Sequence, residues 1–252
     1  MTQNRAIRYF MGVHKFAPLL AINGDMGWIS TQHRRWVNIL RFWNRLVNMP
    51  DDRLPKKMFS YDYNCFGKTW CYDVKTILQQ IQMSHYYENK LPVNLKDVED
   101  ALFVKYKTDW CNNVRNVAKL RTYIEFKQHY NTEKYLLSSL TKIERSHLAQ
   151  FRCGILPLKI ETGRYVGLNV NERFCHFCPV NVVEDETHFL LNCIKYNDLR
   201  ENLLSKCKDR NPDFEHMSEV NKLVYAVNYH YVHVAKFLVE AMNRRRMSLY
   251  RN

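Results

Sequence analysis

The chain has 252 residues, 46% of them apolar, and its 38 Lys and Arg outnumber its 25 Asp and Glu, for a formal net charge of +13. With only 7 Gly and 7 Pro, the composition excludes a collagen-like or low-complexity chain and allows one large domain or two small ones. No stretch reaches the roughly 18 consecutive apolar residues of a membrane span. The basic excess favours an anionic partner, most often a nucleic acid, although it can also serve solubility alone.

The N-terminal segment does not have the pattern of a signal peptide, because Arg5 and Arg8 interrupt its apolar residues and no long apolar region follows. We therefore expect an intracellular, reducing compartment, in which the eight cysteines are free thiols or metal ligands.

The first elements are predicted to be two short helical turns over residues 1–29, punctuated by Pro18 and Gly24. Ser30 is then predicted to cap a helix that runs to about Met49. Its apolar residues recur with the spacing i, i+3, i+4, i+7 of a helix that buries one face. These residues are Trp36, Ile39, Leu40, Trp43, Leu46 and Val47.

The opposite face of this helix is basic and contains Arg34, Arg41 and Arg45 without an acid among them. Residues 1–60 hold 10 Lys and Arg against 3 Asp and Glu, so +7 of the net charge of +13 lies there. The pattern predicts a surface that faces phosphates. The alternative is an ordinary exposed helix face.

The segment from residue 56 to 86 is rich in aromatic residues, which either stack on bases or, as is more common, belong to the core. Further helices are predicted after Asn94, and a capping box of Thr141 and Glu144 predicts the start of the next one. Two more are expected over residues 198–206 and 218–246. Because alternating strand patterns are nearly absent, we expect a mainly α, helical bundle-like assembly.

The segment FCHFCPVNVVEDETHFLLNC, residues 174–193, contains a C-x2-C-x9-H-x4-C array of Cys175, Cys178, His188 and Cys193. Three thiolates and an imidazole in one short window are what a structural Zn²⁺ ion requires. A catalytic zinc is disfavoured because no position is left open for water. The alternative is that the cysteines are small core residues.

The spacing within the array also predicts local structure. Asp185 is expected to cap a helix that contains His188 about one turn in. Cys193 follows His188 by five residues, roughly 140° around an ideal helix, so the helix must end or loosen near Asn192 for both to face one ion. Phe174, Phe177, Phe189 and Leu190 are expected to pack around the metal.

Residues 4–46 and 147–200, with the CCHC array inside the second segment, resemble the region that follows the polymerase domain in reverse transcriptases of non-LTR (LINE-type) retrotransposons. The resemblance implies a helical region that binds template RNA or target DNA and carries a zinc knuckle on Cys175, Cys178, His188 and Cys193. It also implies that the chain corresponds to part of a longer protein, and by analogy a nuclear location. We predict nucleic-acid contacts at Arg34, Arg41, Arg45, Arg152 and Arg164.

Catalytic motifs are not apparent in the sequence. Tyr61-Asp62-Tyr63-Asn64 lacks the paired aspartates that two-metal polymerase chemistry needs, and no Gly-rich phosphate loop is present. We therefore expect a non-enzymatic, zinc-stabilised nucleic-acid-binding region with no small-molecule substrate. The alternative is a structural or protein-interaction fragment with a zinc-stabilised fold. The predicted regions are a basic helical region (1–140), the CCHC module with its flanking helices (141–210) and a C-terminal amphipathic helix (211–252).

Overall fold

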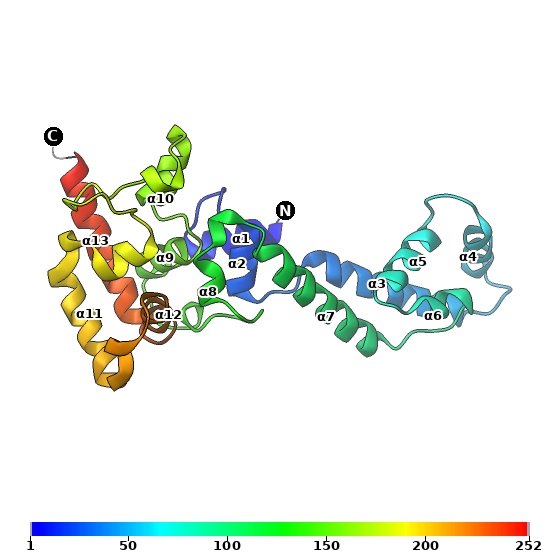
Figure 1. Ribbon diagram of the computed structural model, residues 1–252. Helices are drawn as coiled ribbons and strands as arrows, with labels where there is room; N and C mark the ends of the chain where they lie inside the picture. The colour runs from blue at the N-terminus through cyan, green and yellow to red at the C-terminus, as the bar shows by residue number, and fades with distance from the viewer. Residues whose placement is uncertain (1, 251–252) are drawn as a thin grey trace. The chain divides into compact units, whose positions relative to one another are not determined.

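The computed structural model describes residues 2–250, and most of these residues lie in helices (Figure 1). Within these residues the only β-type pairing is an isolated antiparallel bridge between Phe174 and Val183. The prediction of a mainly α fold is confirmed. None of the helices in this part of the chain combines the length and the apolar character that crossing a membrane requires.

The chain divides into two compact units, one formed by residues 29–111 and the other by the residues on both sides of that segment. This division differs from the three predicted regions, 1–140, 141–210 and 211–252. The reason is that α1, at the start of the chain, packs with α2 and with α9, far along the chain, through contacts that local sequence patterns do not reveal.

The unit of residues 29–111 is built on α3 (Thr31–Val47), whose predicted apolar face is buried. The Ser30 side chain accepts a hydrogen bond from the Gln32 N–H at 3.1 Å, as predicted for the cap of this helix. Trp43 is fully buried, and its indole N–H donates to the Leu91 carbonyl at 2.9 Å. The other helices are α4 (Leu54–Asn64), α5 (Trp70–Gln80), α6 (Ser84–Glu88) and most of α7 (Leu95–Val114).

The second unit has α9 (Lys142–Arg152) packed along α13 (Tyr231–Tyr250) at its centre. The predicted capping box is present at the start of α9, where Thr141 and Glu144 bond to each other's backbone N–H groups. The remaining elements are α1 (Thr2–Met11), α2 (Leu19–Met26), η1 (Ala118–Leu120), α8 (Tyr123–Phe126), η2 (Lys134–Leu136), α10 (Lys159–Thr162), η3 (Gly163–Val166), η4 (Val170–Glu172), η5 (His188–Asn192), η6 (Ile194–Tyr196), α11 (Asn197–Arg210), η7 (Pro212–His216) and α12 (Glu219–Tyr229).

A buried ionic network joins α2 to α9. Arg152 donates to both carboxylate oxygens of Asp25, at 2.9 and 3.1 Å, and both side chains are almost completely buried. The hydroxyls of Tyr123 and Tyr135 also donate to Asp25, at 3.0 and 2.9 Å. These bonds give both buried charges the partners that they need in a low-dielectric interior.

The final predicted helix, residues 218–246, is in fact two helices. The backbone leaves the helical conformation at His230, with φ −117° and ψ 29°, between α12 and α13. Neither Gly nor Pro marks this break in the sequence. The His230 ring is buried, so tertiary packing holds the break in place.

Candidate metal centre

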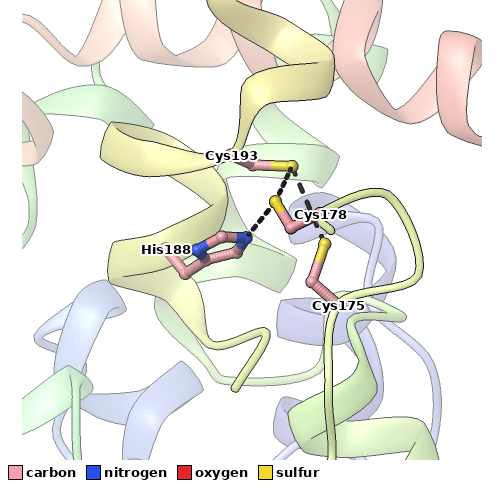
Figure 2. Close-up of side chains that lie close together, drawn as sticks. All are labelled: Cys175, Cys178, His188 and Cys193. Carbon is pink, nitrogen blue, oxygen red and sulfur yellow. Dashed lines mark hydrogen bonds between the residues drawn. The ribbon is translucent and has the colours of Figure 1, made fainter. Parts of the chain in front are cut away.

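The four residues of the CCHC array meet at one point, although they come from two separate pieces of chain (Figure 2). Cys175 and Cys178 lie in a loop that the bridge between Phe174 and Val183 closes, and the Cys175 N–H donates to the Val182 carbonyl at 2.8 Å. His188 begins η5, and Cys193 follows its last residue. The four ligand atoms all lie within 4.8 Å of one another.

A π-helical turn brings His188 and Cys193 together, although Cys193 lies five positions after His188 in the sequence. Residues His188–Asn192 form a wide turn in which the Cys193 N–H donates to the His188 carbonyl, five residues back, at 2.8 Å. This i to i+5 bond brings Cys193 over His188, whereas an ideal α-helix would turn it away. Asp185 caps the turn by accepting the His188 N–H at 2.8 Å. The expected cap and the expected loosening of the helix near Asn192 are both confirmed.

Three of the six distances between the ligand atoms match the edges of a tetrahedral metal site. The Cys175 and Cys193 sulfurs are 3.8 Å apart, and the Cys178 and Cys193 sulfurs are 3.9 Å apart. The Cys178 sulfur lies 3.4 Å from Nε2 of His188. A tetrahedral Zn²⁺ with Zn–S bonds of about 2.3 Å and a Zn–N bond of about 2.0 Å needs edges of about 3.8 and 3.5 Å, respectively. The cluster can therefore hold a metal ion with little rearrangement.

The cluster is enclosed on most sides. Cys175, Cys193 and His188 are buried, and Cys178 is half-buried. Of the four apolar residues that we expected around the metal, Phe189 and Leu190 are fully buried, while Phe174 and Phe177 are half-buried. The Phe189 ring packs edge-on against Tyr196 at 5.0 Å and against Phe237 of α13 at 5.9 Å. These contacts tie the cluster to the core of its unit.

A hydrogen bond between two sulfurs of the cluster shifts their pKa values in opposite directions. The bond between the two sulfurs, together with burial, raises the pKa of Cys175 to about 12. The same bond lowers the pKa of Cys193, which opposes the effect of its burial. A metal bound by the cluster would take the thiolate form of each cysteine and release the protons.

Glu184 contacts both the cluster, at Cys175, and α13, at Arg245. Its Oε1 is 3.7 Å from the Cys175 sulfur, its Oε2 accepts the Lys159 N–H at 2.8 Å, and both oxygens accept from Arg245, the second at 2.8 Å. Glu184 is fully buried and Arg245 is 4% exposed. Charged groups in this position orient metal ligands and tune their charge.

Arg200 supports the other side of the cluster. It donates to the backbone carbonyls of Leu190 and Cys193, each at 2.7 Å, and it is buried. The Cys193 carbonyl, just after the π-helical turn, also accepts the Tyr196 N–H at 3.2 Å. The guanidinium thus fixes the backbone on both sides of Asn192.

The burial of Arg245 has a signal in the sequence. Val234, Leu238 and Ala241 are buried along one stripe of α13, and Arg245 continues that stripe at the i+4 position. A charge on a buried stripe indicates a buried counterion, which for Arg245 is Glu184.

The five arginines predicted to contact nucleic acid differ in their surroundings. Arg34, Arg41 and Arg45 are exposed on α3, and none forms an ion pair with a carboxylate of residues 2–250. Arg164 is exposed but pairs with Glu161 at 3.1 Å. Arg152 is 1% exposed and paired with Asp25, so the prediction that it projects toward nucleic acid is corrected: its guanidinium satisfies a buried carboxylate.

Comparison with models of protein families, with curated proteins and with solved structures found no match.

Proposed function

We propose that this chain is a zinc-stabilised nucleic-acid-binding module, equivalent to the region that follows the polymerase domain in a non-LTR retrotransposon reverse transcriptase. In this proposal the zinc ion is structural and the arginine face of α3 binds phosphates. The observation that carries the binding function is the exposed row of Arg34, Arg41 and Arg45.

The choice of zinc rests on the chemistry of the ligands. Three cysteine sulfurs and one histidine nitrogen form a closed, soft donor set, with the spacing of a tetrahedron. Ca²⁺ and Mg²⁺ prefer oxygen ligands, and a catalytic zinc would keep a position for water. Because the ion has four protein ligands, we assign it a structural role: it holds the loop of Cys175 and Cys178, which has few apolar residues of its own.

The arrangement of the arginines on α3 favours a polyanion. Seven and eleven residues separate Arg34 from Arg41 and from Arg45, close to two and three whole helical turns, so the three side chains form one stripe about 16 Å long. α3 contains no Asp or Glu. A stripe of this kind can contact several phosphates along one strand and release their counterions.

The test is the salt dependence of binding to single-stranded RNA and to duplex DNA, measured by fluorescence anisotropy. We expect replacing Arg34, Arg41 and Arg45 together by Gln to weaken binding and to lower the slope of log K against log salt by about 2 to 3. The matched control replaces three exposed lysines of the same unit, Lys57, Lys68 and Lys96, by Gln. Equal slopes for both triple variants would contradict the assignment of α3.

A second candidate function, a protein-interaction module without nucleic-acid affinity, is favoured by one observation. Arg34 and Arg41 line a groove together with Glu99 and Asp100 of α7, whose negative charges reduce the attraction for phosphate. If the unaltered chain binds neither nucleic acid, even at low ionic strength, this second function is supported and the first is rejected.

A further inference from the structure

A groove of about 620 Å³ lies in the unit that contains the Cys/His cluster. The proposed function assigns no role to this groove. Its walls come from α9, α10, α13 and the loop that carries the first two cysteines. α13 contributes Val239, Met242, Arg246 and Leu249, which follow one another at intervals of three or four residues. These residues form a stripe about 15 Å long on one face of the helix.

The apolar side chains of this groove are left partly uncovered. Ile143 on α9 is 60% exposed and Leu249 on α13 is 42% exposed, while Val239 and Met242 are half-buried. Exposed aliphatic side chains that line a concave surface, with a flexible methionine among them, are typical of a groove that receives the apolar face of a helix.

The charged groups that line the groove are all positive. Lys159, Arg245 and Arg246 line it, together with the imidazoles of His147 and His176, and within the described chain no Asp or Glu does so. Arg245 is already paired with Glu184, which leaves Lys159 and Arg246 as the charges available to a ligand.

The three consecutive arginines of α13 therefore differ in what they contact. Arg244 pairs with Asp198, at 2.6 and 2.8 Å, and Arg245 pairs with Glu184. Arg246 is exposed, and among residues 2–250 its hydrogen bond goes to the neutral Asn243, at 3.1 Å. Its charge is thus uncompensated at the rim of an apolar groove.

We propose that this groove binds an acidic amphipathic helix of a partner protein. The aliphatic floor takes apolar side chains of that helix at positions i, i+3 or i+4, and i+7, and Lys159 and Arg246 pair with its carboxylates. A nucleic-acid strand fits the groove less well, because no Phe, Tyr or Trp among its described lining residues offers a surface for bases to stack on. A flat membrane surface cannot reach the floor of a groove between two helices.

The experiment measures the anisotropy of a labelled 12-residue peptide, with Leu at helical spacing and Glu elsewhere, on addition of the full, zinc-loaded chain. The comparison ligands are a scrambled peptide of the same composition and a labelled single-stranded oligonucleotide. We expect the amphipathic peptide to bind and the scrambled one to bind at least about tenfold more weakly, a difference of about 1.4 kcal/mol.

Two variants locate the site. Lys159→Glu with Arg246→Glu should weaken peptide binding at least about tenfold, and Met242→Ala several-fold, whereas Lys236→Glu, on α13 but outside the groove, should leave it unchanged. Unaltered zinc content and melting temperature confirm that the variants fold. Three results would overturn the proposal: no peptide binding up to about 1 mM, equal binding to all variants, or loss of oligonucleotide binding alone in the charge-reversal variant. None of these depends on the α3 arginines, so the proposed function stands or fails separately.

Discussion

At the scale of single residues, buried charges in this protein hold together parts of the chain that are distant in sequence. Glu184 and Arg245 lie 61 residues apart, and each is the principal counterion of the other. An isolated buried pair of this kind contributes little net stability compared with apolar residues, but removal of one partner leaves the other charge without compensation.

We predict that Glu184→Gln destabilises the unit that contains the metal cluster by about 3 kcal/mol, because Arg245 would remain buried without its counterion. The substitution should also weaken metal binding roughly tenfold, since the group behind Cys175 loses its charge. Chemical denaturation and competition with a chelator measure the two effects. The double variant Glu184→Gln with Arg245→Met should recover part of the stability, and a double variant less stable than the single one would contradict this account.

At the scale of secondary-structure elements, the position of α2 on α9 depends on Arg152. Its guanidinium contacts Asp25 of α2 and lies 3.2 Å from the Glu133 carboxylate. Burial disfavours the charge of Arg152, but these carboxylates outweigh that effect and raise its pKa. Its side chain is therefore a structural link between elements.

We predict that Arg152→Met lowers the free energy of unfolding by about 3 to 5 kcal/mol, because Asp25 would stay buried with only its tyrosine partners. Arg145→Met, on the same helix but half-buried, should cost less than about 1 kcal/mol. Urea denaturation followed by circular dichroism compares the two. A similar small effect for both would show that the network around Asp25 does not hold α2 in place.

At the scale of the whole molecule, the helices and the residues of the candidate metal centre were predictable because both follow from local spacing. The stripe on α3, the capping box at Thr141 and the need for a looser turn before Cys193 are visible in short windows of sequence. The burial of Arg152 was not, because its counterion Asp25 lies 127 residues away. The break at His230 was also missed, since packing rather than a Gly or Pro places it.

The division into two compact units has the same origin. The segment of residues 29–111 forms its own unit, but no linker of distinct composition marks its two ends, so local sequence patterns predicted boundaries at residues 140 and 210 instead. The net charge of +13 does not distinguish buried from exposed arginines. Some of the arginines that contribute to it are buried counterions, and others, such as Arg34 and Arg246, are exposed.

The most direct test of this account is the zinc content of the purified chain, measured by elemental mass spectrometry without chelator in the buffers. We predict about one zinc per chain, lost in His188→Ala and in Cys193→Ser. Cys111→Ser, which alters a half-buried cysteine outside the cluster, should keep its zinc. A parent chain without zinc, whose two cluster variants unfold at the same temperature as the parent, would contradict the central claim that a metal ion holds this unit together.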